Sequence, residues 1–529
     1  MFSCLLQPCE DTTIFTSRFS LSSGVFLESE FLRDQKAYIR DMGKYLSSLS
    51  NPKMRLLSEN LKATIRVMPE WGQYPWRKYE DLPFEFTIYN SFKLLLLLPL
   101  QVLFSLAYLL AKYFQYLPYR RTKAVGANQT RLSFFSPCVH LEEFVEPDVL
   151  GFWGEVKFLD PRLKSEATWF LIPYKAPGIS HRKIARQISR VQINSDFSIF
   201  SIASLFDLTL LVKACTRVIK FQYYIGSLAL RKLLSLTTVD SVGIIETENL
   251  GVGIARVELN HYLIESALSK FRPLQYVFHL MEGQSWEIAL RHHANGLNLK
   301  TVGVIHTPIR RQDSQILNHL IHQDGELSLS SIEKILCPSQ DGARYLEDLG
   351  VLSSSLQLVE AQRFSHRSTI SEHSYSNSSR KLLYVADASS INSEYFQRQI
   401  LGHLETVGGE AFDVHLQSHP AGTPILSSTF RSWSAKERGE WGLVIFGPET
   451  SAYLQPEFAN SNVRIYRPRN FLSKTSTVEA HEIPLLEDFG FVLESILDPF
   501  ILGEANGSLI NRNFDFPEWR KVIHDVLQS

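Results

Sequence analysis

Short apolar runs separated by amphipathic stretches dominate the chain from about residue 165 onward. The runs ATWFLIPY, LQYVFHLM, LKTVGVIHT, KILCPS and LQLVEA are rich in β-branched and aromatic residues, which is typical of strands. Between two of them, SWEIALRHHANGL predicts a helix with one apolar face made by Trp286, Ala289, Leu290, His293 and Leu297. Strands that alternate with helices in this way predict βαβ units and a parallel sheet.

The alternation is interrupted once and then restarts. The stretch SHRSTISEHSYSNSSRK is rich in serine and poor in apolar residues, which predicts an exposed linker over 367–379. Beyond it, RKLLYVAD, FDVHLQ, WGLVIFG and NVRIYRP predict further strands with helices between them. We therefore predict an α/β protein with two Rossmann-like, doubly wound lobes, the first over 124–366 and the second over 380–529.

The first part of the chain has a different texture. Mixed charges and leucines at helical spacing between residues 30 and 65 predict helices, so we assign 1–90 to an N-terminal helical subdomain. The sequence MFSCLLQPCEDTTIF has no basic start and no long apolar core, and it does not resemble a secretory signal. This region offers no candidate chemistry.

A hydrophobic segment over 91–123 follows the helical subdomain. It holds no charge from Leu94 to Ala111, which is close to the ~20 apolar residues that a bilayer crossing needs. Pro99 and Gln101 interrupt it, and basic residues on both sides give no clear orientation. Three interpretations stay open: a hairpin that dips into or lies on a membrane, a true span, and a buried helix of a soluble domain. The segment's tyrosines would suit a membrane interface; they are Tyr108, Tyr113, Tyr116 and Tyr119.

Composition narrows the range of functions. The chain has 529 residues, more than one hydrophobic core usually supports, and its 54 Lys and Arg nearly cancel its 55 Asp and Glu. This balance removes any bulk electrostatic case for nucleic acid as a partner. The five cysteines are scattered without a CxxC spacing, so neither a disulfide framework nor a zinc site is indicated, and a reducing cytosol fits best.

Polar residues follow several predicted strands at the point where ligands bind to α/β sheets. Each alone is often a helix cap or a loop residue, but five in register across two lobes favour a site in the cleft between the lobes. These residues are Glu282, His306, Glu360, Asp387 and His419.

Two motifs in the second lobe suit a phosphate group. The imidazole of His419 can donate to a phosphate oxygen, and Pro420 fixes the backbone that carries it. In FGPETSAYL, a strand leads through a turn into Thr450 and Ser451, whose hydroxyls and amides at a helix start favour an anion. An ordinary Thr or Ser cap is the alternative for this second motif, and it stays open.

The first lobe offers a base and two guanidinium groups. Glu282 in EGQSWE could take a proton from a substrate hydroxyl, whereas Glu287 complements the dipole of the following helix. Arg310 and Arg363 could bind a carboxylate or phosphate, with surface solvation as the alternative.

Several other kinds of chemistry lose support. The histidine pairs, such as His292 with His293, lack a carboxylate or cysteine cluster, so no metal site is expected. The sequence also has no DxD, no GxGxxG after a strand, no GxxxxGK[ST] and no GxSxG. Metal-bound nucleotide-sugar chemistry of the DxD type, dinucleotide redox chemistry and serine hydrolysis therefore lose support.

Taken in order, FWGEV, MEGQSWEIAL, VGVIHTPIRRQD, LVEAQRF, LQSHP and GPETSAYL resemble the bacterial surface carbohydrate (O-antigen) biosynthesis proteins, glycosyltransferases of the GT-B type with two Rossmann-like lobes. The resemblance spans about residues 145 to 490. The chain departs from the family pattern at Gly283, where the family has Asn, and at Gln362, where it has Leu. These departures bear on the substrate more than on the fold.

The resemblance, through the HP motif of sialyltransferase-like enzymes, implies roles for the candidate residues. It implies Glu282 as the catalytic base and a donor site formed by His419, Pro420, Thr450 and Ser451. To these we add His306, with His419, as catalytic candidates, and Asp387 and Ser389 as donor-site candidates. Acceptor or anion binding would fall to Arg310, Arg363 and Glu360.

The implied function is transfer of a sugar from a nucleotide-activated donor, such as a CMP-nonulosonic acid, to a surface polysaccharide or lipid-linked glycan. The reaction would be inverting and independent of metal, with the nucleotide sugar as co-substrate and no other cofactor. The expected location is the cytoplasmic face of the inner membrane, reached through the hydrophobic segment. The alternative is a catalytically inactive, membrane-associated scaffold of a glycan assembly complex, which the departures at Gly283 and Gln362 favour.

Overall fold

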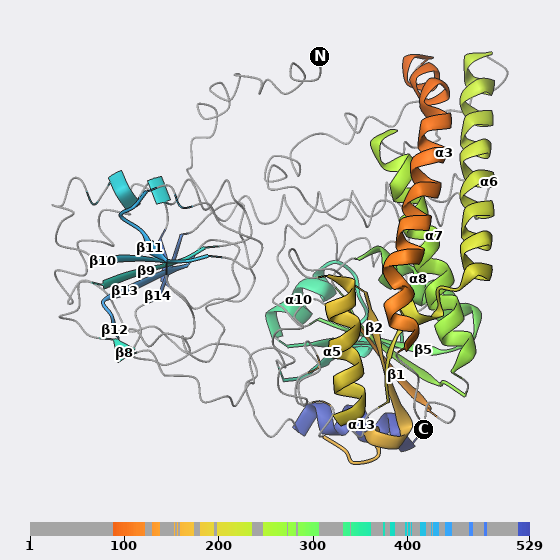
Figure 1. The fold of residues 1–529 in the computed structure, drawn as a ribbon. Helices are drawn as coiled ribbons and strands as arrows, with labels where there is room; N and C mark the ends of the chain where they lie inside the picture. Colours follow the sequence, from red (N-terminus) through yellow and green to blue (C-terminus); the bar gives the residue numbers. More distant parts are fainter. Residues whose placement is uncertain are drawn as a thin grey trace.

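The structure is a computed structural model, and most of its described residues belong to two separate sheets with their helices (Figure 1). It describes residues 88–121, 130–137, 153, 156, 159–173, 180–194, 198–234, 247–271, 273–281, 284–305, 332–338, 340–360, 374–375, 381–386, 397–398, 400–402, 404, 413–418, 425, 427–432, 440–446, 465–468, 481–483 and 517–528. The predicted N-terminal subdomain, apart from residues 88–90, lies outside the described residues.

Seven strands form the first sheet, in the order β3-β2-β1-β4-β5-β6-β7. Every neighbouring pair is parallel. The order reverses between β1 and β4, as in a Rossmann sheet. The strands are β1 (Leu132–Pro137), β2 (Ala167–Ile172), β3 (Ser198–Ser201), β4 (Tyr276–Leu280), β5 (Lys300–Val304), β6 (Lys334–Cys337) and β7 (Leu356–Leu358).

The second sheet repeats this arrangement with six strands, in the order β11-β10-β9-β13-β14-β15. Its pairs are also parallel, and its order reverses between β9 and β13. Two Rossmann-type sheets confirm the predicted α/β, doubly wound fold class. The strands are β9 (Lys381–Val385), β10 (Asp413–Gln417), β11 (Arg431–Ser432), β13 (Leu443–Phe446), β14 (Ile465–Pro468) and β15 (His481–Ile483).

A small additional pair of strands lies within the range predicted as linker. There β8 (Ser374–Tyr375) pairs in parallel with β12 (Glu440–Trp441), which immediately precedes β13. Two residues inside the predicted linker 367–379, Ser374 and Tyr375, therefore pair as a strand with residues that directly precede β13 of the second lobe.

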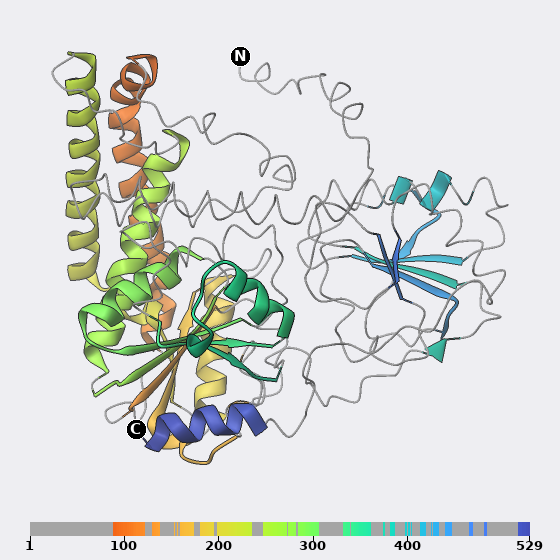
Figure 2. The same cartoon turned by 180° about the vertical axis from the view of Figure 1, so that it is seen from behind.

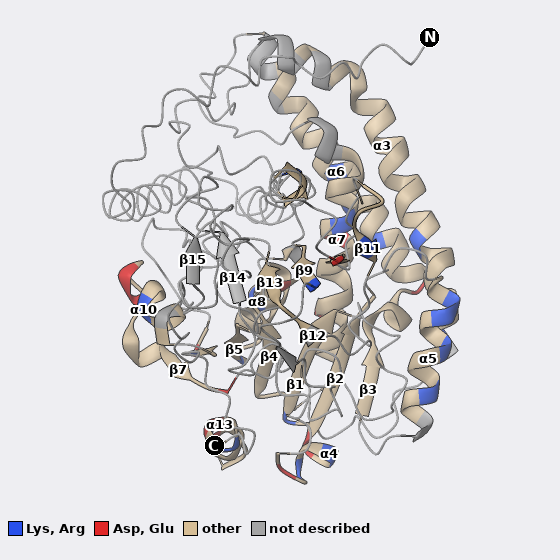
Figure 3. Cartoon of the chain, turned by 90° about the vertical axis from the view of Figure 1, so that its left-hand side faces the viewer, with Lys and Arg blue, Asp and Glu red and all other residues tan. Residues whose placement is uncertain are grey.

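The helices of the described residues belong mostly to the first lobe (Figures 1 and 2). The long helices α3 and α6 run side by side, and α7 contacts both of them. The helix α5 lies against β3 and against η4, the short helix that continues α3 (Figure 3). The helices are α3 (Ile88–Tyr116), η4 (Leu117–Arg121), α4 (Leu163–Glu166), α5 (His181–Asn194), η8 (Ile202–Leu205), α6 (Leu208–Leu233), α7 (Thr247–Lys270), α8 (Ser285–Gly296), α10 (Gln340–Asp348), η9 (Ser353–Ser355) and α13 (Pro517–Gln528).

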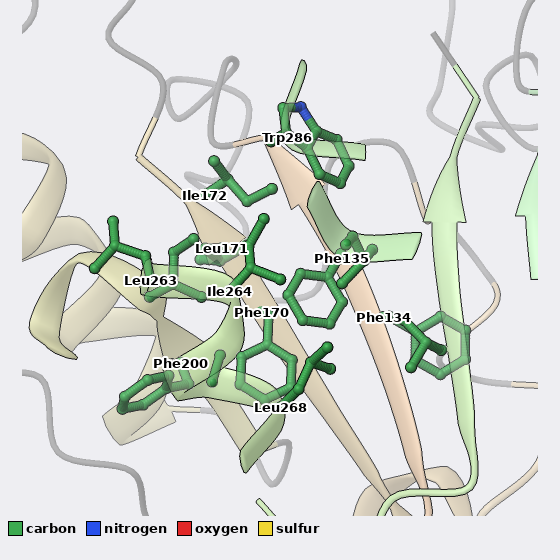
Figure 4. Packing of buried hydrophobic residues seen from close by; sticks show 14 of the residues in the cluster. Phe134, Phe135, Phe170, Leu171, Ile172, Phe200, Leu263, Ile264, Leu268 and Trp286 are labelled. Atoms are coloured by element: carbon green, nitrogen blue, oxygen red, sulfur yellow. The ribbon is translucent and has the colours of Figure 1, made fainter. Parts of the chain in front are cut away.

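Aromatic side chains fill both faces of the first sheet. Phe134 stacks on Trp169 at 4.2 Å between ring centroids, while the adjacent Phe135 stacks on Phe170 at 4.6 Å. Successive residues of a strand point to opposite faces, so these two stacks lie on opposite sides of the sheet. Figure 4 shows Leu263, Leu268 and other residues of α7 beside Phe170. Burial on both faces explains why the strands read as continuous apolar runs.

The C-terminal helix α13 packs on the first lobe, although the sequence analysis assigns it to the second. Trp519 is fully buried in the core of the first lobe. Arg520 donates to the carbonyl oxygen of Leu159 at 2.9 Å, and Arg131 donates to that of Leu527 at 3.2 Å. The end of the chain is therefore part of the first lobe.

The hydrophobic segment forms one continuous helix, α3, that passes through Pro99. A hairpin within the segment, one of the predicted alternatives, is therefore wrong. By length and composition, one helix of the described residues could cross a membrane, over Leu95–Arg120 with a mean hydropathy of 1.9, and 17% of that window is buried. This low burial also contradicts the alternative of a buried helix in a soluble core.

Three of the four tyrosines of this segment pack against the first lobe. Tyr116 and Tyr119 are buried against His181, with centroid distances of 5.5 and 5.9 Å. The ring of Tyr113 packs edge-on against Phe206 at 6.0 Å. These rings attach the C-terminal end of α3 and the following η4 to the first lobe.

Candidate functional site

The carboxyl edge of the first sheet places two predicted site residues after neighbouring strands. Leu280, the last residue of β4, is in register with Val304, the last residue of β5. The amide of Met281 also donates to the carbonyl oxygen of Val304 at 2.9 Å, so the pairing continues to the strand ends. Glu282 and His306 each follow these paired residues by two positions. The strand ends that precede them in the chain are therefore neighbours at this edge.

The second sheet has the same relationship at its carboxyl edge. Val385, the last residue of β9, is in register with Gln417 of β10 and with Phe446 of β13. Asp387 follows Val385 by two positions, and His419 follows Gln417 by two. The stretch with Thr450 and Ser451 begins directly after Phe446. The order of the sheet reverses between β9 and β13, which is where doubly wound sheets bind ligands.

Most of the predicted site residues lie outside the described residues themselves. The structure fixes the strands that precede them and says nothing of their side chains, so their roles stay predictions. These residues are Glu282, His306, Arg310, Arg363, Asp387, Ser389, His419, Pro420, Thr450 and Ser451.

Glu360 is the predicted site residue that the structure describes. It follows β7 by two positions and is 2% exposed. Its carboxylate accepts from the backbone amides of Glu518 at 3.0 Å and Trp519 at 3.1 Å, and its carbonyl oxygen accepts from the Trp519 indole at 2.9 Å. A carboxylate on free amides in the first turn stabilises a helix start. Holding α13 explains the burial of Glu360 without any ligand, and its predicted anion-binding role stays a prediction.

Two buried groups at the same edge are held in their neutral forms. Burial lowers the pKa of His279 in β4 to about 3, and its Nδ1 lies 2.7 Å from the carbonyl oxygen of Leu280. Burial raises the pKa of Cys337, at the end of β6, to about 12. A thiol with so high a pKa is not a nucleophile at neutral pH. His279 and Cys337 are therefore core residues of the first sheet near its carboxyl edge.

The sequence analysis did not predict the burial of charge at the start of α8. Glu287 in its first turn is fully buried, and Arg291, one turn later, is 9% exposed. The (i, i+4) spacing of a carboxylate and a guanidinium is a recognisable pairing signal in the sequence. Helix α8 begins three residues after Glu282, so the buried Glu287 lies close to the candidate base in the sequence.

The histidines of α8 form a cluster with a histidine of α7. Nδ1 of His261 lies 3.0 Å from Nε2 of His293, and His292 lies within 6 Å of both rings. Burial lowers the pKa of His293 to about 4 and that of His261 well below its usual value. Within the described residues, no group of three or more His, Cys, Asp or Glu is placed to hold a metal ion. The cluster is therefore a neutral packing contact between α7 and α8.

A shallow groove lies at another part of the first lobe, between β7 and α13. It is lined by residues that include Lys334, Gln357, Glu518 and Lys521. Lys334 is the first residue of β6, so the groove extends to the amino edge of the sheet. Ligands of doubly wound sheets bind at the opposite edge. Of the candidate residues, Glu360 borders the groove, because the amide of Glu518, which lines it, donates to the Glu360 carboxylate.

Comparisons with solved structures find UDP-GlcNAc 2-epimerases and a trehalose-phosphate synthase. A UDP-N-acetylglucosamine 2-epimerase from Listeria monocytogenes has a TM-score of 0.42 and 9% identity, over 76% of this chain and 96% of that one. The UDP-GlcNAc 2-epimerase from Neisseria meningitidis bound to UDP-GlcNAc has a TM-score of 0.39 and 10% identity, over 75% and 99%. The α,α-trehalose-phosphate synthase (UDP-forming) from Burkholderia vietnamiensis has a TM-score of 0.38 and 9% identity, over 76% and 100%.

No protein-family model matches the chain, and no curated protein is similar to it. The TM-scores of these three structures all lie below 0.5. The fold class rests instead on the strand order of the two sheets, and the resemblance to surface carbohydrate enzymes stays a prediction from the sequence.

Proposed function

We propose that this protein is a glycosyltransferase that uses a nucleotide-activated sugar. The observation that carries the proposal is the register of β9, β10 and β13 at the carboxyl edge of the second sheet. Three predicted donor-binding elements follow these neighbouring strands: Asp387 with Ser389, and the two that suit a phosphate, His419 with Pro420 and Thr450 with Ser451. Phosphate groups bind at this edge of Rossmann-type sheets, and the strand order reverses there.

The first lobe supplies the acceptor side of the reaction. Support for this comes from the chain order: the candidate base Glu282 and the polar residue His306 follow the paired ends of β4 and β5. Arg310 and Arg363 would bind anionic groups of the acceptor.

The reaction follows from these roles. The carboxylate of Glu282 takes the proton of an acceptor hydroxyl, whose oxygen then forms a bond to the anomeric carbon of the donor. The bond between that carbon and the phosphate oxygen breaks, and its electron pair leaves with the nucleotide. His419 and the hydroxyls of Thr450 and Ser451 stabilise the charge that develops on the phosphate. Attack from the side opposite to the leaving group inverts the anomeric centre, and no step requires a metal ion.

Calorimetric titration of the full chain with CMP, UDP and GDP tests the donor site. The proposal expects one of these nucleotides to bind, and it expects His419→Ala to weaken that binding about tenfold or more, because a charge-assisted bond to phosphate is lost. His524→Ala, in an exposed residue of α13, is the matched control and should bind as the wild type does. If no nucleotide binds, or His419→Ala binds as tightly as the wild type, the proposal is wrong.

A further inference from the structure

The outer face of α3 is an apolar stripe that no described residue covers. Its residues recur at spacings of three, four and seven, which places them on one side of a helix. Each is at least 48% exposed, and some exceed 60%. The stripe consists of Phe92, Leu96, Leu100, Leu103, Phe104, Leu110 and Phe114.

The opposite face of α3 is fixed in a helix bundle. Ser105 donates to the carbonyl oxygen of Gly251 in α7 at 2.6 Å, and Gln222 of α6 donates to Ser105 at 2.7 Å. Gln222 also donates to the carbonyl oxygen of Gln101 at 3.3 Å. The same face also buries Leu109 and Tyr116, so α3 is apolar on its outer face as well as on its inner one, which is not the pattern of a surface helix in water. The outer stripe therefore requires an apolar partner.

The neighbouring helix α6 shows which orientation toward a bilayer is possible. It runs beside α3 and exposes apolar residues of its own, including Val212, Ile219 and Tyr223. However, Lys213 and Lys220 in the same helix are exposed as well, and Arg217 pairs with Glu258 of α7 at 2.9 Å. A perpendicular insertion of the α3 and α6 pair would bring these charges toward the hydrocarbon, which is costly. An orientation in the plane of the membrane leaves them at the head groups.

A basic helix continues the same side of the molecule. Helix α5 contains no acidic residue, and its exposed positions include Arg182, Lys183, Arg186 and Arg190. Arg182, Arg186 and Arg190 are four residues apart and so share one face. Figure 3 shows α3 and α5 along one side of the molecule, with the Lys and Arg of α5 coloured blue. Helix α5 also contacts α3 and η4.

We propose that this face binds an anionic lipid bilayer from one side, with the apolar stripe of α3 in the acyl boundary, α3 parallel to the membrane plane, and α5 on the head groups. An apolar stripe beside a basic face is the combination that binds anionic membranes. The charges argue for a bilayer over a second copy of the chain, because α5 would meet its own positive charge in a symmetric dimer. This inference does not depend on the proposed sugar transfer.

Vesicle sedimentation with the full chain tests the binding. We expect binding to vesicles of phosphatidylcholine with 30% phosphatidylglycerol at physiological salt, and binding at least about tenfold weaker to phosphatidylcholine alone. The triple variant R182Q/R186Q/R190Q should lose the preference for anionic vesicles. The control K300Q/K334Q/K521Q removes the same charge from the amino edge of the first sheet and from α13, and it should bind as the wild type does.

A second variant tests the apolar stripe. L103Q/F104Q should weaken binding to anionic vesicles about tenfold or more, while thermal unfolding stays close to that of the wild type, since both side chains are exposed. The proposal is overturned if the wild type does not bind vesicles, or if it binds both kinds of vesicle equally. It is also overturned if the wild type is a dimer without lipid and L103Q/F104Q dissociates that dimer.

Spin labels measure the orientation. Nitroxides at residues 96, 103 and 110 all lie on the stripe, so a helix in the membrane plane gives them one common depth. A membrane-crossing helix instead separates residues 96 and 110 by about 21 Å in depth, at about 1.5 Å per residue. The labelled chains carry serine at Cys4, Cys9, Cys138 and Cys215 and keep Cys337, which is fully buried. Graded depths would overturn the in-plane arrangement.

Discussion

Val385 and Gln417 are paired in register at the carboxyl ends of β9 and β10, and the amide of Ala386 donates to the carbonyl oxygen of Gln417 at 3.0 Å. Asp387 and His419 each follow this pair by two residues. In the other lobe, Leu280 and Val304 are paired in the same way ahead of Glu282 and His306. The candidate residues therefore follow paired strand ends by the same number of positions in both sheets.

Replacing the proposed base should separate catalysis from binding. Glu282→Gln removes the proton acceptor and keeps the size of the side chain, so sugar transfer should fall about 10²- to 10⁴-fold while nucleotide affinity changes little. The measurement is glycan assembly in cells together with calorimetric titration of the nucleotide. Glycan assembly at the wild-type level would contradict the enzyme and favour the inactive scaffold.

The contact between Glu360 and α13 should contribute to the stability of the first lobe. Glu360→Ala leaves the amides of Glu518 and Trp519 without their acceptor, so we expect a loss of about 1–3 kcal/mol in the free energy of unfolding. Urea denaturation of the full chain measures this loss. Lys521→Ala, on the exposed side of the same helix, is the control and should change stability by less than about 0.5 kcal/mol. Equal stability of both variants would show that the contact contributes nothing.

Stability should fall as the solution becomes acidic. His279, His261 and His293 have pKa values lowered by burial, so the folded chain leaves them neutral while the unfolded chain protonates them near pH 6.5. The unfolded state then binds more protons, and stability is lost as the pH falls from about 6.5 toward 4, by up to about 1.4 kcal/mol per pH unit for each histidine. Thermal unfolding at several pH values measures the trend. His279→Leu should reduce the slope, and an unchanged slope would exclude His279 as a contributor.

Two glycines of the helix bundle should respond differently to substitution. A Cβ at Gly251 would meet the backbone oxygen of Gln101 at 3.3 Å, so Gly251→Leu should force α7 away from α3 and cost about 1–3 kcal/mol. A Cβ at Gly226 would meet only the side chains of Leu98 and Leu95, which can move, so Gly226→Ala should be tolerated. Chemical denaturation compares the two variants. A larger loss for Gly226→Ala would contradict this description of the bundle.

The sequence predicts β2, β4, β5, β6, β7, β9, β10, β13 and β14, because these strands are distinct apolar runs, but it does not predict β1, β3, β11 or β15. The run LQYVFHLM contains β4, and WGLVIFG contains β13. The helix predicted at SWEIALRHHANGL coincides with α8 over Ser285–Gly296. These elements are set by local composition, which a single sequence shows directly.

Other elements depend on contacts that a single sequence does not show. The role of Glu360 depends on Trp519, which lies 159 positions later in the chain. The burial of Tyr116 and Tyr119 depends on His181, which reaches them through α5. The long helices α6 and α7 combine apolar and charged residues and were not predicted, although Asp207 caps α6 by accepting from the amide of Leu210 at 2.8 Å. Long-range packing decides all of these features.

The central claim is that the carboxyl edge of the second sheet binds the phosphate of a nucleotide sugar. A crystal structure of the full chain with the nucleotide that binds most tightly tests it most directly. The account predicts that the phosphate lies beyond the ends of β9, β10 and β13, within hydrogen-bond reach of His419. A phosphate in the groove between β7 and α13, or at the amino edge of either sheet, would contradict it.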